Sequence, residues 1–155
     1  MPMYRLQKEV WIPHPREAVF DFFSKAENLN RITPPDLHFE ILTPTPIDIQ
    51  MGKLIDYRIR VMGIPFGWQT RIQSFDPPHA FIDEQLHGPY RRWVHEHTFV
   101  SENGGTRMRD TVDYDPGGWI LAPMVNALFV GPRVRSIFNY REQTLLEIFR
   151  PEGGI

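Results

Sequence analysis

The chain has 155 residues, of which 41% are hydrophobic and 23% charged, a composition typical of one folded domain rather than a disordered segment. Its 17 basic and 19 acidic residues give a formal net charge of −2, so the charge provides no argument for nucleic-acid binding. Cysteine is absent, which excludes disulfides, thiolate nucleophiles and cysteine-ligated zinc.

The first ten residues alternate polar and apolar side chains and lack the apolar core of a signal peptide, which predicts a cytoplasmic protein. The longest apolar stretch, Trp119 to Val130, contains Pro123 and Asn126 and is shorter than the ~20 residues that span a bilayer. We therefore expect no membrane insertion. Because this stretch is apolar almost all round, it packs in the core, covers a pocket as a lid or meets another subunit.

The first third of the chain predicts a strand, two short helices and a second strand. Tyr4 to Ile12 alternate with the period of a strand that has one covered face. Pro15 suits the first turn of a helix, and apolar residues follow at helical spacing as far as Phe23. Residues 28–32 form another helical turn, and alternation resumes over Leu37 to Leu42.

The rest of the chain predicts an antiparallel meander and one long helix. Five alternating runs separated by Gly, Pro and Asn clusters are Lys53 to Val61, Phe66 to Phe75, Ala80 to Leu86, Arg91 to Val100 and Thr106 to Tyr114. Residues 133–149 carry an apolar stripe at helical spacing, beginning after Pro132 and ending before Pro151. Nothing divides the chain, so we expect one domain over residues 1–155. Its fold class is α+β, a seven-stranded curved antiparallel sheet around the C-terminal helix, with a hydrophobic cavity between them.

This order of elements resembles the helix-grip fold of the START, birch-pollen-allergen and polyketide cyclase superfamily, abbreviated SRPBCC. The stretches that carry the resemblance are PHPREAVFDFF, ENLNRITPP, LIDYRIRVMGIPFGWQTRI, DEQLHGPYRRWVHEHTF, GGTRMRDTVDY and IFNYR. They are similar to the subgroup also found fused to epimerase-like short-chain dehydrogenase domains. The resemblance implies a single ligand-binding domain that holds a small molecule in its cavity.

Two neighbouring strands place polar residues on the covered face. The Asn103-Gly104 turn predicts a two-residue hairpin, whose register sets His97 against Asp110. A carboxylate beside an imidazole favours the protonated ring. The pair is therefore a candidate for acid–base catalysis or a structural element of a polar wall.

In the strand over residues 80–86, alternation alone leaves open whether Asp83 or Glu84 points inward. We expect Asp83 and Gln85 to face the cavity together with His95. His95 and His97 also have the same-face spacing of two metal ligands, with Asp110 or Asp83 as a third. Paired strand histidines are more often hydrogen-bonded core members, so the sequence predicts no metal and no cofactor.

The aromatic residues at alternating strand positions are either ordinary core members or the wall of a pocket for a flat ligand. These residues are Tyr57, Trp68, Trp93, Phe99 and Tyr114. Arg141 lies within the apolar stripe of the last helix, which points its guanidinium toward the sheet. It then reaches water, pairs with an inward carboxylate or binds an anionic ligand group.

Three functions remain in competition. The first is binding of a small, mostly hydrophobic molecule, aromatic or acidic-ended. The second is a polyketide cyclase- or dehydratase-like enzyme with His97 and Asp110 as the acid–base pair and an inward Arg or Gln85 polarising a carbonyl. The third, implied by the resemblance alone, is an interaction module for an epimerase-like oxidoreductase. A homodimer is a further possible assembly.

Overall fold

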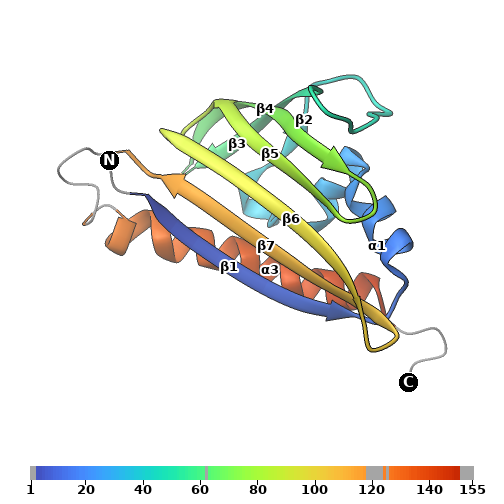
Figure 1. The fold of residues 1–155 in the computed structure, drawn as a ribbon. Coiled ribbons are helices and arrows are strands. Elements are labelled where there is room, and N and C mark those ends of the chain that lie inside the picture. Colours follow the sequence, from blue (N-terminus) through green and yellow to red (C-terminus); the bar gives the residue numbers. More distant parts are fainter. Residues whose placement is uncertain (1–2, 62, 118–123, 125, 151–155) are drawn as a thin grey trace.

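The computed structural model describes residues 3–61, 63–117, 124 and 126–150. Its strands are β1 (Tyr4–Ile12), β2 (Glu40–Ile41), β3 (Leu54–Val61), β4 (Ile64–Asp76), β5 (Ala80–His87), β6 (Arg92–Glu102) and β7 (Gly105–Asp115). Its helices are α1 (Arg16–Phe23), η1 (Ala26–Ile32), η2 (Pro35–Leu37), η4 (Asn126–Val130) and α3 (Gly131–Ile148). In Figure 1 the sheet curves across α3, and α1 lies at one end of it.

The seven strands form one sheet in the order β1-β7-β6-β5-β4-β3-β2, and every neighbouring pair is antiparallel. The meander over β3 to β7 and the return of β1 to the side of β7 give the helix-grip arrangement that the sequence predicts. The α+β fold class is therefore confirmed.

The main differences from the sequence prediction lie at the edge of the sheet. The second strand covers only Glu40–Ile41, because η2 and a left-handed His38 with φ of 48° replace the start of the predicted strand. The second short helix is a 3-10 helix, η1. Of the apolar stretch expected to be core, lid or interface, residues 119–123 and 125 lie outside the described residues. Met124 and Phe129 are exposed.

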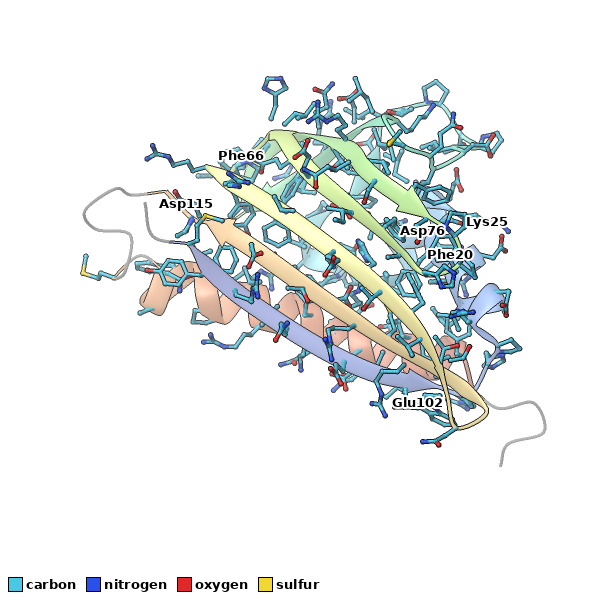
Figure 2. The ribbon with its side chains drawn as sticks, in the orientation of Figure 1. Phe20, Lys25, Phe66, Asp76, Glu102 and Asp115 are labelled. Atoms are coloured by element: carbon cyan, nitrogen blue, oxygen red, sulfur yellow. The ribbon has the colours of Figure 1, made fainter. Side chains whose placement is uncertain are left out.

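The β6–β7 hairpin has the register that its turn residues predict. Asn103 and Gly104 have φ of 51° and 77°, the left-handed pair that a two-residue turn requires and that Asn and Gly tolerate best. Glu102 then pairs with Gly105, and His97 pairs with Asp110. In Figure 2, Glu102 and Asp115 mark the two ends of this hairpin.

Helix α3 begins with Pro132 in its first turn, a position where proline needs no hydrogen-bond donor. After Gly131, its buried positions are Val134, Phe138, Arg141 and Leu145, and they recur at the spacing that aligns side chains along one helix face. Arg141 therefore points toward the sheet, as the sequence predicts.

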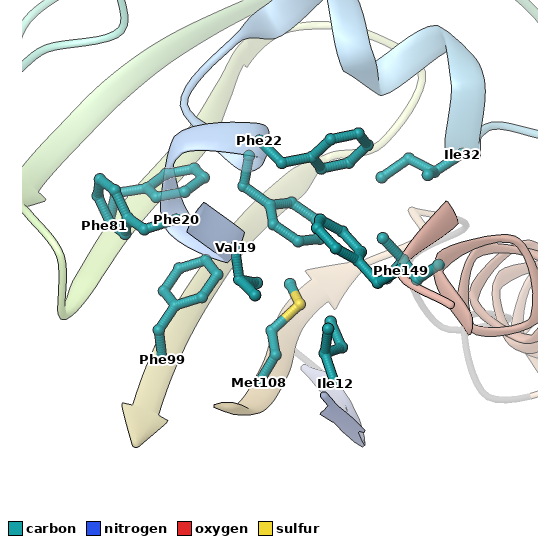
Figure 3. Packing of buried hydrophobic residues seen from close by; sticks show 11 residues of the cluster. Ile12, Val19, Phe20, Phe22, Ile32, Phe81, Phe99, Met108 and Phe149 are labelled. Carbon is teal, nitrogen blue, oxygen red and sulfur yellow. The ribbon is translucent and has the colours of Figure 1, made fainter. Parts of the chain in front are cut away.

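The end of the molecule next to α1 is a solid core. Val19, Phe20 and Phe22 of α1 pack against Phe99 and Met108 of the sheet, as Figure 3 shows. Phe99 is 1% exposed and Met108 is completely buried. This packing closes one end of the space between the sheet and α3.

Candidate functional site

A cavity of about 190 Å³ lies between the other part of the sheet and the helices. Its walls come from β3, β4, β5 and β6, from α1, η1 and η2, and from α3. Most of its lining is aliphatic or aromatic, including Ile59, Ile72 and Phe138. Lys25, which follows α1 and is labelled in Figure 2, also borders the cavity.

Most of the residues singled out in the sequence border this cavity. They are Tyr57, Trp68, Asp83, Trp93, His95, His97 and Arg141. The pairing of Asp83 with His95 and of Phe81 with His97 across β5 and β6 fixes the faces of β5. Asp83 thus faces the cavity, while Glu84 pairs with Arg71.

Four of the expected site residues do not line the cavity. The side-chain amide of Gln85 donates to the carbonyl of Tyr90 at 2.7 Å and accepts from its N–H, so it holds the β5–β6 loop. Phe99 belongs to the solid core. Tyr114 packs with Trp93 in a second hydrophobic cluster, and its hydroxyl donates to Asn126 Oδ1 at 2.7 Å. Asp110 lies outside the lining and contacts side chains that border it.

The polar end of the cavity is a network of five side chains, named the polar cluster here: Asp83, His95, His97, Asp110 and Arg141. His97 Nε2 lies 2.7 Å from Asp83 Oδ2, and His95 Nε2 lies 2.8 Å from Asp110 Oδ1. Each histidine therefore bonds a diagonal neighbour rather than the carboxylate directly opposite it in the register. His97 Nδ1 also lies 3.3 Å from Asp110 Oδ1. The predicted pair of His97 and Asp110 is therefore in contact, but His97 lies closer to Asp83.

Arg141 connects α3 to this network. Its Nη2 donates to Asp110 Oδ1 at 3.0 Å and lies 3.4 Å from His97 Nδ1. The guanidinium carbon lies 5.1 Å from the ring centre of Phe23 and 5.6 Å from that of Phe138, positions that favour cation–π attraction. The residue is only 5% exposed, and Asp110 offsets its charge.

The cluster shifts the ionisation of its members in opposite directions. Burial raises the pKa of Asp110, but the charge of Arg141 and the two histidine hydrogen bonds outweigh it and hold this pKa well below its usual value. For Asp83, burial is again outweighed, here by the hydrogen bond from His97 and by nearby positive charges, and the pKa is lowered. Both carboxyl groups are therefore ionised at neutral pH.

The pKa values of the two histidines are shifted in opposite directions. Burial opposes protonation of His97, but its hydrogen bonds with Asp110 and Asp83 raise its pKa. Burial and the neighbouring His97 lower the pKa of His95 to about 4. With His97 protonated and His95 neutral, the two carboxylates balance one guanidinium and one imidazolium. The cluster is then neutral as a whole.

Three of these residues have the chemistry of a metal site. The ligand atoms of Asp83, His95 and His97 lie within 4.8 Å of one another, and two imidazoles with a carboxylate suit zinc or iron. However, the two rings stack with centres 3.7 Å apart and planes at 25°, so their in-plane lone pairs run side by side instead of converging. The guanidinium of Arg141 near His97 also opposes a cation.

The sequence missed several residues that shape the cavity. Tyr90 lies in the loop before β6, contacts Trp68 and Trp93 with ring centres 5.6 and 4.8 Å away, and burial raises its pKa to about 12. No periodicity exists in a loop, so no sequence signal identifies it. Arg133 also borders the cavity and donates to Asp36 of η2 at 2.6 Å, a contact between segments about a hundred residues apart.

Solved structures of known proteins have the same fold as this chain. The chain superposes on Zhui aromatase/cyclase from Streptomyces sp. R1128 with a TM-score of 0.71 and 18% identity, covering 99% of this chain and 100% of the other. Ginseng major latex-like protein 151 from Panax ginseng gives a TM-score of 0.65 and 8% identity, with 96% and 99% covered. These similarities establish the fold.

A third structure is the nucleoside-diphosphate sugar epimerase from Corynebacterium glutamicum, with a TM-score of 0.62 and 24% identity. The match covers 92% of this chain but only 28% of that protein, in agreement with the resemblance to epimerase-fused relatives. No curated protein matches the chain by sequence. Within the described residues, no helix has both the length and the apolar character needed to cross a membrane.

The family comparison covers most of the chain. Residues 12–137 match the family described as polyketide cyclase / dehydrase and lipid transport. This span runs from the end of β1 into α3 and includes every strand that borders the cavity. The chain therefore belongs to the polyketide cyclase / dehydrase and lipid transport family, within the helix-grip superfamily.

Proposed function

We propose that the protein binds a small, mostly hydrophobic molecule with an aromatic body in the cavity between the sheet and α3. One observation carries the proposal: an apolar cavity ends at a cluster of ionisable side chains. This combination of apolar walls and a few convergent polar groups is typical of small-molecule sites. Membership of a family with ligand-binding relatives supports the same conclusion.

The cavity size indicates the size of the bound body. Its volume is about 190 Å³, whereas an apolar cavity of about 150 Å³ in another protein holds benzene. A body of one or two rings therefore fits. Trp68 and Trp93, whose planes meet at 85°, provide flat apolar surfaces for such rings.

Cavity filling tests the proposal against surface binding. Ile59 borders the cavity and is 8% exposed, whereas Ile64 on the adjoining β4 is 58% exposed. We expect methylnaphthalene to raise the melting temperature of the wild type and of Ile64→Trp but not that of Ile59→Trp. A ligand at 100 times its Kd stabilises the folded state by about 2.7 kcal/mol. Equal stabilisation of both variants would place the ligand elsewhere and overturn the proposal.

Acid–base catalysis is a second candidate because His97 borders the cavity between two carboxylates. In this candidate, the partner on the cavity side is Asp83, and Asp110 orients the ring from behind. A substrate whose conversion is lost in His97→Gln while its affinity and the fold are retained would support catalysis. Unchanged turnover in that variant would exclude His97 from the reaction.

Association with an epimerase-like oxidoreductase, and a homodimer, stay predictions. The support for the first is the epimerase whose chain this fold matches over 28% of its length. Analytical ultracentrifugation of the purified chain, alone and mixed with an epimerase-like oxidoreductase, tests both. If the chain sediments as a monomer both alone and in the mixture, both predictions are contradicted.

A further inference from the structure

The five members of the polar cluster differ in their access to the cavity. The side chain of Asp83 is 20% exposed, whereas those of His95, His97, Asp110 and Arg141 are only 5–7% exposed. Asp83 also borders the cavity, while Asp110 does not. Asp83 is therefore the member that a bound molecule can reach most directly.

The hydrogen bonds of the cluster leave one oxygen of Asp83 available. Its Oδ2 takes the contact with His97 Nε2 at 2.7 Å, and within the described residues no side chain or backbone N–H donates to its Oδ1. An ionised carboxylate is an acceptor only. The cavity thus presents a hydrogen-bond acceptor to its ligand at this point.

Among the described residues, every hydrogen-bond donor of the cluster except Arg141 Nη1 is either bonded within the cluster or enclosed. Arg141 Nη2 and His95 Nε2 both contact Asp110 Oδ1, at 3.0 and 2.8 Å. Arg141 Nε is fully enclosed and has no partner among the described residues, so it offers nothing to the cavity. The charge of the Arg141 guanidinium is already offset by Asp110, so an anionic ligand group finds no unpaired positive charge in the cluster.

The charges lead to the same conclusion. With Asp83 and Asp110 ionised and Arg141 and His97 cationic, the cluster is balanced without any ligand. An ionic group brought into this buried site loses its hydration and has no free counter-charge. A neutral donor loses less hydration and gains a hydrogen bond to a charged acceptor.

We propose that the ligand ends in a neutral hydrogen-bond donor, a hydroxyl or phenol, and that this group donates to Asp83 Oδ1. The inference rests on the proposed function and replaces the acidic end group that the sequence suggests with a neutral one. Asp83 is then the residue that selects the polar end of the ligand, while the apolar walls bind its body.

Four probes with one shared body test the inference: methylnaphthalene, naphthol, naphthoate and naphthylmethylammonium. Calorimetric titration of the wild type should give naphthol an affinity about tenfold to a hundredfold above that of methylnaphthalene, the range expected for a hydrogen bond to a charged group. Naphthoate and naphthylmethylammonium should bind more weakly than naphthol. Because the hydroxyl binds in its neutral form, the measured heat should not depend on the ionisation enthalpy of the buffer.

We expect Asp83→Asn to reverse the preference of the cavity for a neutral hydroxyl over a carboxylate. The amide carbonyl can keep the hydrogen bond from His97 while the NH₂ group faces the cavity as a donor. Naphthol should lose at least tenfold in affinity, naphthoate should gain, and methylnaphthalene should change less than twofold. The control is Asp113→Asn, which removes an exposed carboxylate paired with Arg5 on the outer face of the sheet and should leave all four affinities unchanged.

The outcomes separate the two proposals. If methylnaphthalene binds but naphthol gains no advantage, or if naphthoate or naphthylmethylammonium binds most tightly, the inference is wrong while cavity binding stands. If no probe binds the wild type, the proposed function fails and the inference fails with it. If Asp83→Asn does not fold, the inference is still tested by the wild-type affinities for the four probes and by the dependence of the binding heat on the buffer.

Discussion

The two ends of the space between the sheet and α3 are built from similar residues but packed differently. Beside α1, Phe20, Phe99 and Met108 fill the space completely. Beside β3, β4 and β5, Tyr57, Trp68 and Trp93 surround a cavity. Val19 and Phe20 of α1 pack into the first end. The second end is bordered by Phe22 and Phe23 of α1 and by Ala26, Asn28, Leu29 and Ile32 of η1.

This difference shows that aromatic strand residues do not by themselves distinguish a core from a binding site. What distinguishes them is whether helix side chains pack directly onto the strand residues, as Val19 and Phe20 do at the solid end. The polar cluster lies where the two ends meet: the ring of His97 stacks on Phe81 of the solid core with centres 4.1 Å apart, and it also borders the cavity.

The largest expected effect on the free energy of unfolding comes from removing the charge of Arg141 from the polar cluster. Arg141→Met leaves the carboxylate of Asp110 buried without its cation and should lower the free energy of unfolding by about 3 to 5 kcal/mol in urea denaturation. The double variant with Asp110→Asn should recover part of this loss, since the stranded charge is removed. The exposed Arg135 on the same helix provides the control, Arg135→Met. Equal losses in both single variants would contradict the buried pair.

The pH dependence of stability should have a maximum near the pKa of free histidine, about 6.5. The pKa of His95 is about 4 in the folded protein, so its contribution is present above 6.5 and is lost as the pH falls toward 4, by about 3 kcal/mol. The raised pKa of His97 acts oppositely: its contribution is full below 6.5 and is lost as the pH rises through the folded value.

Urea denaturation between pH 4 and 9 measures both limbs. His95→Gln should flatten the acid limb and His97→Gln the alkaline limb. Acid loss below about pH 4 remains in both variants, because the lowered pKa values of Asp83 and Asp110 act there. A stability that rises steadily from pH 6.5 to 9 in the wild type would show that His97 is not held as an imidazolium.

Matched truncations measure the packing difference itself. Ile12 is completely buried in the solid core and Ile59 borders the cavity. Ile12→Ala should cost about 2 to 5 kcal/mol because it opens a new void. Ile59→Ala should cost less, about 1 to 2 kcal/mol, since its side chain already faces open space on one side. Equal unfolding free energies for the two variants would indicate that the second region is packed as tightly as the first.

The smallest effect is expected at the pair between Arg133 and Asp36, whose side chains are 34% and 67% exposed. Asp36→Asn should change the free energy of unfolding by less than about 1 kcal/mol, because solvent screens exposed ion pairs. The same variant should leave the affinity for methylnaphthalene within twofold. A larger loss of stability, seen in the same urea denaturation, would show that η2 is held to α3 chiefly by this pair.

Much of the fold follows from the sequence because alternation, proline positions and one Asn-Gly turn are local signals. The register that pairs His97 with Asp110 needs only the turn residues and the period of two. The inward position of Arg141 needs only helical spacing. These predictions are confirmed by the pairing and burial of the residues.

The details of the site depend on contacts that have no local signal. The diagonal link of His97 to Asp83 depends on how β5 lies against β6, and the loop between them gives no register in the sequence. Gln85 alternates with the cavity residues, yet its amide turns to the backbone of Tyr90. Phe99 was expected in the wall and instead fills the core because α1 covers it, a tertiary contact that periodicity does not encode.

A crystal structure of the wild-type protein saturated with naphthol tests the central claim most directly. We predict the ring system between the aromatic wall at Trp68 and the polar cluster, with the hydroxyl within hydrogen-bond distance of Asp83 Oδ1. Naphthol bound on the outer face of the sheet, with the space between Trp68 and His97 free of ligand, would contradict the account.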